Sequence, residues 1–280
     1  MKSVIAEELK RRRGLGGVLM ILWAVAWAVA GIARLTDGPR MALWSAGEAP
    51  FGPLQYAETV AGLVIAVGVG WAGARLRREP GTGLAIGALG AFILHRALIS
   101  LHRGAEAWLR VGVASGVLQD MFCAGALIWF VHRSAAGPSP DERKIPPVVD
   151  LGLLILVGRD ALPLLAPPVG FGSLRQLPQL LQSSPVDVGL GIIGMLLGIC
   201  ALGLALARIG GARIIAPATS ALLSASMLYA FILMGTEVGM RAEGVPGVAT
   251  RLSLYATAIM HLIERGMLLS AVRRKQRDAE

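Results

Sequence analysis

Charged and aromatic residues are scarce in this chain of 280 residues. Only 16% of the residues are charged and 5% are aromatic, whereas charged residues make up about 25% of an average soluble domain. Apolar residues account for 55% of the chain, and the mean hydropathy is positive at +0.64. This composition excludes an ordinary soluble globular domain and favours a helical protein embedded in a lipid bilayer.

Several signatures of catalysis are missing as well. The sequence contains no GxxxxGK[ST] loop for ATP, no HExxH zinc motif and no clustered Cys/His set. Cys123 and Cys200 both fall in long apolar segments, where thiols behave as small apolar residues. The four histidines do not form two clear cross-helix pairs for haem. The sequence therefore identifies no cofactor, predicts no metal site and favours a role other than that of an enzyme.

Eight apolar segments divide the chain, and each is close to the twenty or so residues that cross the hydrocarbon core of a bilayer. The sequence therefore predicts an all-α polytopic integral membrane protein with about eight transmembrane helices. The predicted spans are 14–34, 58–76, 83–102, 110–132, 147–166, 187–208, 214–236 and 250–272. The 36 glycines agree with this class, because membrane helices pack closely through small residues.

The basic residues are distributed unevenly between the two sides of these spans. If the N-terminus lies inside, the inner segments hold 17 Lys and Arg and the outer segments hold 7. The positive-inside rule then predicts a multi-pass inner-membrane protein with both termini in the cytoplasm. The net charge of +9 is explained by this topology, so we expect the lipid bilayer, and no nucleic acid, as a partner.

The order of loops indicates two tandem four-helix units. Each half has a span, a long outer loop, a span, a short basic inner turn, a span, a short outer turn and a span. The long outer loops are predicted at 35–57 and 167–186. The predicted parts are a basic cytoplasmic N-terminus, a first four-helix unit, a cytoplasmic linker, a second four-helix unit and a basic tail, at 1–13, 14–133, 134–147, 148–272 and 273–280.

Three basic and three acidic side chains fall inside predicted spans, where a charge is costly unless it is paired or functional. They are Arg96 in the third span, Asp120 in the fourth, Arg159 and Asp160 in the fifth, and Glu264 and Arg265 in the eighth. His261 shares a helix face with Glu264 and Arg265 and could relay protons. Two interpretations stay open: ion pairs that lock the bundle, or a ligand or proton pathway near mid-depth.

A second candidate site contains His95 and His102, which are seven residues apart on one face of the third span. The stretch LHRGAEAWLRVGVASG, followed by LQD, resembles the anchor subunits of DMSO-reductase-type complexes. This resemblance implies eight spans in two four-helix bundles and a quinol site near an outer-facing His-x-Gly turn. The matching residues would be His102, Gly104, Arg110 and Asp120. The stretch falls between the third and fourth spans, whereas the family has it between the second and third.

Three functions are compatible with these features. The leading prediction is an inner-membrane permease-like protein that moves a small solute or ion, with the buried acidic residues available for proton coupling. The first alternative is a quinone-interacting membrane anchor that binds redox partner subunits. The second alternative is a non-catalytic membrane signalling or assembly factor, in which all six buried charges form structural pairs with no transport role.

Overall fold

The described part of the chain is entirely helical. The computed structural model describes residues 2–44, 52–79, 81–109 and 113–135, together with single positions within 151–155 and 256–267. Its helices are α1 (Lys2–Trp44), α2 (Pro53–Arg78), α3 (Gly83–Leu109) and α4 (Val113–Arg133). These ranges contain no strand, so the all-α prediction is confirmed for them. The predicted spans from residue 187 to 236 lie outside the described residues.

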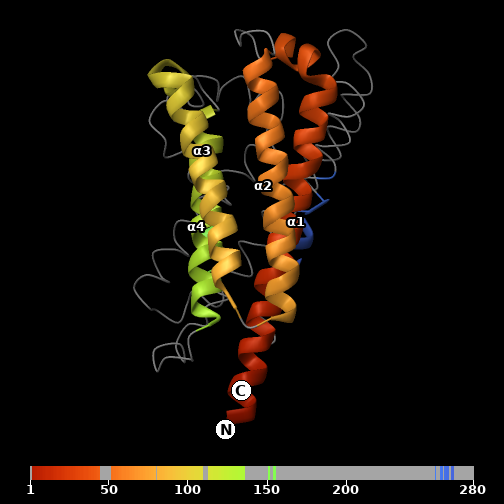
Figure 1. Cartoon of the computed structure of the whole chain (residues 1–280), viewed down its shortest axis with the longest axis vertical. Helices are drawn as coiled ribbons and strands as arrows, with labels where there is room; N and C mark the ends of the chain where they lie inside the picture. Colours follow the sequence, from red (N-terminus) through yellow and green to blue (C-terminus); the bar gives the residue numbers. More distant parts are fainter. Residues whose placement is uncertain are drawn as a thin grey trace, which may run out of the picture.

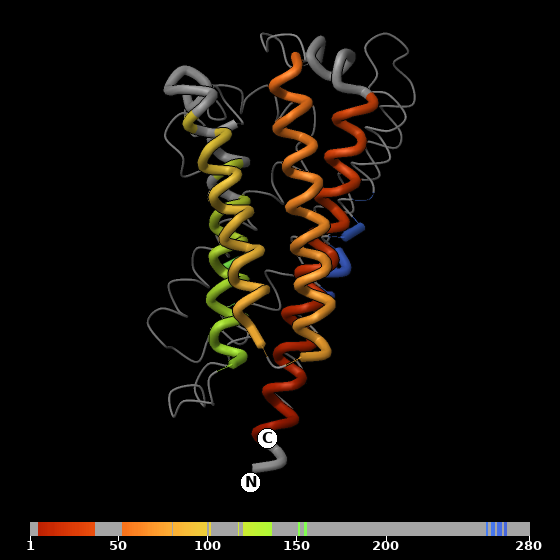
Figure 2. The backbone as a smooth tube through the Cα atoms, viewed as in Figure 1, coloured from red at the N-terminus to blue at the C-terminus, as the bar shows by residue number. Residues whose placement is uncertain are grey.

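The four helices run alternately up and down in one elongated bundle (Figure 1). α1 packs along α2 and α3 packs along α4, while contacts of α2 with α3 and of α1 with α4 complete the bundle. The start of α1 lies at the same end as the last turns of α2 and α4 (Figure 2). We call this the inner end, because the basic N-terminal segment lies there, and we call the opposite end the outer end.

The helices extend beyond several of the predicted span boundaries. α1 includes the basic N-terminal segment, where Arg12 Nε donates a hydrogen bond to Glu8 Oε1 one turn earlier at 3.0 Å. Such i,i+4 pairs support a helix that has no apolar face of its own. The prediction of a loop over 35–57 is wrong at both ends, because α1 continues to Trp44 and α2 begins at Pro53. Proline suits this first helical position because it needs no backbone donor there.

Large apolar side chains cover the outside of α2. Val60, Val64, Val67 and Trp71 recur at helical spacing, and we call these four residues the apolar stripe; Val67 is 69% exposed. The buried side of the same helix consists mainly of small residues. A soluble helix has the opposite arrangement, with its large apolar residues inside, so a lipid environment explains α2 better than water does.

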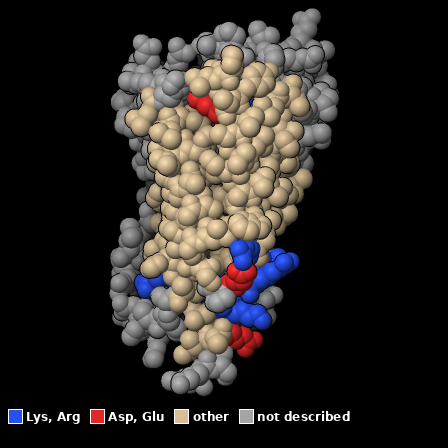
Figure 3. All heavy atoms as spheres, viewed as in Figure 1, with Lys and Arg blue, Asp and Glu red and all other residues tan. Residues whose placement is uncertain are grey.

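Length and charge agree with a membrane location. Two helical stretches, Ile5–Thr36 and Pro53–Arg78, are long and apolar enough to cross a bilayer, and α3 contributes a shorter apolar stretch at Gly83–Ile99. Charged side chains gather at the inner end, and a broad uncharged band separates them from an acidic patch near the outer end (Figure 3). The described part of the chain therefore contains two helices that can span a membrane.

α1 and α2 cross at Gly17 and Gly73, a contact that we call the glycine crossing. A Cβ atom on Gly73 would lie 2.7 Å from the carbonyl oxygen of Gly17 and 2.9 Å from the Cβ of Met20. A Cβ atom on Gly17 would lie 2.5 Å from the carbonyl oxygen of Gly73. The two backbones therefore touch, and this close approach is the type of packing that small residues allow between membrane helices.

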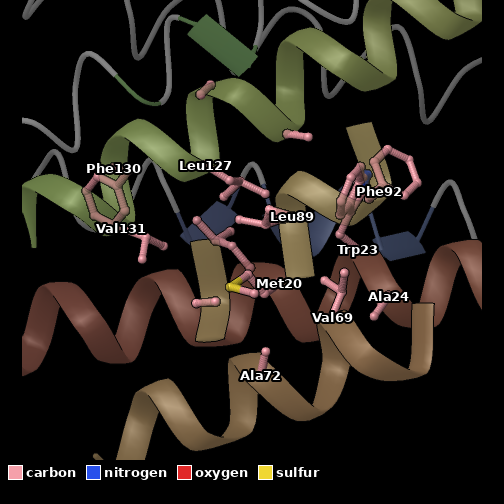
Figure 4. Packing of buried hydrophobic residues seen from close by; sticks show 14 of the residues in the cluster. Met20, Trp23, Ala24, Val69, Ala72, Leu89, Phe92, Leu127, Phe130 and Val131 are labelled. Carbon is pink, nitrogen blue, oxygen red and sulfur yellow. The ribbon is translucent and has the colours of Figure 1, made fainter. Parts of the chain in front are cut away.

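The core of the bundle lies between all four helices. Met20, Leu89 and Leu127 are at most 2% exposed and lie together near its centre (Figure 4). Trp23 and Phe92 meet edge to face, with ring centroids 4.3 Å apart. Such aromatic pairs add about 0.5–1.5 kcal/mol beyond the burial of their surface. This apolar core lies on the inner-end side of the polar side chains of the candidate site.

Candidate functional site

Six residues from the four helices form a polar cluster in the outer half of the bundle. They are Trp27 of α1, Glu58 and Gly62 of α2, His95 and Arg96 of α3, and Asp120 of α4. α2 and α4 both begin at the outer end, and each contributes residues from its first three turns. We refer to these six residues as the polar cluster.

An ion pair between α3 and α4 lies at the centre of the polar cluster. Arg96 Nη2 is 2.7 Å from Asp120 Oδ2, and the two side chains are only 15% and 23% exposed. A charge-assisted hydrogen bond of this length is strong, but the loss of hydration by both groups offsets much of the gain. The pair is therefore stable only while both groups are charged, because either charge alone would be left in apolar surroundings.

The indole of Trp27 provides a second contact for Arg96. Arg96 Cζ lies 4.8 Å from the centroid of this ring, which is the geometry of a cation–π interaction. Trp27 in turn meets Phe92 edge to face at a centroid distance of 4.8 Å. The guanidinium is thus positioned by a carboxylate on α4 and an aromatic ring on α1. No chemical motif in the sequence marks Trp27, although Trp23 and Trp27 are one turn apart and share a face.

His95 packs against the backbone of α2. Its Nε2 atom lies 3.2 Å from the position that a Cβ atom on Gly62 would take. Glycine at this position therefore leaves the space that the imidazole uses. The charges of Arg96 and Glu58 both act on His95, which places the imidazole in the electrostatic range of both. Glu58, His95, Arg96 and Asp120 thus form a sequence of ionisable groups from α2 through α3 to α4.

The structure brings together some of the predicted site residues and does not describe others. Arg96 and Asp120 are in contact, and His95 is the neighbour of Arg96 on α3. Glu264 is buried, with 3% of its surface exposed. Arg159, Asp160, His261 and Arg265 lie outside the described residues, as does the side chain of His102. That all six charges within the predicted spans meet at one site therefore stays a prediction.

The anchor-subunit resemblance implies a turn that the structure does not contain. α3 continues as a helix through His102 and Gly104 to Leu109. The expectation of an outer-facing His-x-Gly turn at this position is therefore wrong. A single glycine costs about 1 kcal/mol relative to alanine in a helix, and the neighbouring Ala, Glu and Leu residues favour helix strongly enough to continue it.

The polar cluster places a carboxylate, a guanidinium and an imidazole close together inside the bundle. Protonation of Asp120 would remove the negative partner of Arg96 and leave a cation held by Trp27 in surroundings of low polarity. Among the described residues, no group of three or more His, Cys, Asp and Glu side chains is arranged to hold a metal ion. The ionisable side chains of the polar cluster offer the chemistry of protons and charge pairs.

No protein-family model, curated protein or solved structure matches this chain. The polar cluster and the helices around it are therefore the basis for a functional proposal.

Proposed function

We propose that this chain is an inner-membrane protein of about eight spans that moves a small solute or ion across the bilayer with proton coupling. The observation that carries the proposal is the contact of 2.7 Å between Arg96 and Asp120 in the interior of a mainly apolar bundle. Intramembrane charges of this kind are costly, and they often mark the routes of ions and protons. The apolar stripe and the uncharged band support the membrane location.

Asp120 is the proposed proton-exchanging group, and Arg96 is the proposed solute ligand. While Asp120 is charged, its carboxylate is the anion that Arg96 binds. When Asp120 is protonated, Arg96 keeps its charge, because a guanidinium stays protonated in proteins, and it can then attract a small anion. In this scheme the protein binds the anion more tightly when Asp120 is protonated than when Asp120 is charged. This difference in affinity couples proton binding to anion binding.

The remaining ionisable residues extend this pathway. His95 and Glu58 would carry the proton between Asp120 and the outer end, since one imidazole nitrogen can accept a proton while the other donates one. Arg159, Asp160, His261, Glu264 and Arg265 would provide the corresponding groups in the second half of the chain. Both termini would lie in the cytoplasm, as the distribution of basic residues predicts.

Flux measurements in proteoliposomes test this proposal. Vesicles with a pH-sensitive dye inside receive a pulse of a small anion such as chloride, acetate or phosphate, and the internal pH is followed. We expect an anion-dependent pH change that Asp120→Asn and Glu264→Gln each abolish. Glu79→Gln is the matched control, because Glu79 forms an exposed ion pair with Arg75 at the inner end. If both site variants fold and move protons like the unchanged protein, the assignment is wrong.

A purely structural role for the charges is the second candidate, because Arg96 and Asp120 are closed into a direct ion pair. A protein of this kind would be a membrane signalling or assembly factor. The reversed pair, Arg96→Asp combined with Asp120→Arg, distinguishes the two functions. A structural pair needs only opposite charges, so the reversed protein would keep both its fold and its partner proteins. A transport site needs each group in its own place, so the reversed protein would fold and lose flux.

A further inference from the structure

The side chain of Arg77 lies across α1 beside the glycine crossing. A Cβ atom on Gly17 would lie 2.6 Å from Arg77 Cγ and 3.3 Å from Arg77 Cδ. The aliphatic part of Arg77 therefore occupies the space that glycine leaves on α1. The residue is exposed as a whole, so its guanidinium reaches the surface while its stem is held in place. Arg77 is thus a surface cation whose position is fixed by the contact of two helices.

A second arginine lies at the same level on α1. Arg13 precedes Gly17 by one helical turn, and Arg77 follows Gly73 by one turn. α1 and α2 are antiparallel and touch at the glycine crossing, so both arginines lie just beyond this contact toward the inner end. Residues four apart share a helix face, so Arg13 also faces the α2 side of α1. The fold therefore brings two cations together across the helix pair.

The acidic residues of the inner end do not neutralise these two arginines. Within 5–13 and 75–79 there are seven basic and three acidic side chains. Two of the three acidic residues pair with other arginines: Glu8 with Arg12 at 3.0 Å and Glu79 with Arg75 at 2.8 Å. In the described part of the chain, no carboxylate forms an ion pair with Arg13 or Arg77. Among the described residues, this surface therefore has an excess of positive charge.

Trp71 indicates which anions lie at this depth. It is the last residue of the apolar stripe toward the inner end and is 55% exposed. Arg75 Cζ lies 5.3 Å from the centroid of its ring. Tryptophan is enriched at the boundary between hydrocarbon and headgroups. Arg77 is six residues, or about 9 Å along the helix, further toward the inner end, and this places it at the level of the headgroups of the inner leaflet.

We infer that Arg13 and Arg77 bind the phosphate of an anionic phospholipid of the inner leaflet. Two guanidinium groups can each donate paired hydrogen bonds to phosphate oxygens, and the basic surface around them attracts anionic headgroups. The fixed stem of Arg77 makes this a defined site. The inference rests on the proposed membrane location and cytoplasmic termini, but not on transport, because the glycine crossing and the polar cluster share no residue.

Lipid retention by the full-length protein tests this inference. The protein is reconstituted with an equal mixture of phosphatidylglycerol and phosphatidylcholine, extracted in mild detergent, and examined by native mass spectrometry for bound lipid. We expect retained phosphatidylglycerol, and a loss of about tenfold or more in Arg13→Gln combined with Arg77→Gln. The control is Arg11→Gln combined with Arg78→Gln, which removes the same charge from two other exposed arginines.

Three outcomes would overturn the inference. The control could lose as much lipid as the site variant, which would mean that the total positive charge of the surface, and not these two arginines, retains the lipid. The site variant could retain phosphatidylglycerol like the unchanged protein. Added inorganic phosphate could displace the lipid, which would mean that the site binds free phosphate in place of a phospholipid headgroup. If the glutamine variant does not fold, Arg13→Lys with Arg77→Lys replaces it: we expect reduced retention, because lysine cannot donate paired hydrogen bonds, and unchanged retention would refute the arginine assignment.

Discussion

The glycine crossing gives the sharpest prediction for stability, namely that Gly73→Ala destabilises the bundle. The new Cβ atom would lie 2.7 Å from the Gly17 carbonyl oxygen, whereas ordinary contacts begin at 3.4 Å. The helices would have to separate by the difference, about 0.7 Å, and a gap of that size removes a quarter to a half of the attraction between the atoms it separates. Overpacking of this kind costs about 1–3 kcal/mol.

Gly68→Ala is the matched control on the same helix. A Cβ atom at Gly68 would have no heavy atom within 4 Å. This change should be neutral or stabilising by up to about 1 kcal/mol, because alanine favours helix more than glycine does. Unfolding in mixed micelles, followed by tryptophan fluorescence, gives the free energy of unfolding of both variants. If Gly73→Ala is as stable as Gly68→Ala, the two backbones do not touch as described.

Three further predictions concern lipid contact, the ion pair and the buried thiol. Val67 is 69% exposed and assigned to the lipid-facing side, so Val67→Lys should disfavour membrane insertion by about 2.5–3.5 kcal/mol. The control Glu79→Lys should leave insertion unchanged. Insertion is measured with a glycosylation reporter, and equal insertion of the two variants would contradict the lipid-facing assignment. Asp120→Asn alone should lower the free energy of unfolding by about 3 kcal/mol, because it leaves Arg96 as an isolated charge. Adding Arg96→Gln should recover most of that loss. If the losses of the two single variants simply add in the double variant, the two side chains do not stabilise each other. Cys123, 3% exposed, should react with maleimide only after unfolding in a Cys200→Ser background, and rapid labelling of the folded protein would show that α4 is rotated.

Hydropathy predicts the helices of the first half because each must be apolar along most of its length. The sequence places spans at 58–76 and 83–102, and α2 and α3 include these ranges. The first twelve residues of α1, residues 2–13, could not be predicted in this way. Their helical form depends on backbone continuity and on pairs such as Glu8 with Arg12, and neither depends on apolar periodicity.

The polar cluster could be predicted only in part. Arg96 and Asp120 stand out in the sequence, because a charge within an apolar segment needs an explanation. Their pairing depends on the rotation and register of α3 against α4, which no local pattern determines. Trp27 and Gly62 belong to the cluster through contacts alone: one supports a guanidinium and the other leaves space for an imidazole. A tryptophan and a glycine are ordinary residues in membrane helices, so the sequence does not distinguish them from their neighbours.

The central claim, that Arg96 and Asp120 are a working proton-coupled pair, is tested most directly by neutralising both residues together. Arg96→Gln with Asp120→Asn removes both charges and leaves no isolated buried ion, so this variant should fold. Its proton flux in dye-loaded proteoliposomes is compared with that of the unchanged protein after an anion pulse. We expect a folded protein with no anion-dependent flux. A folded double variant that moves protons at the unchanged rate would contradict it.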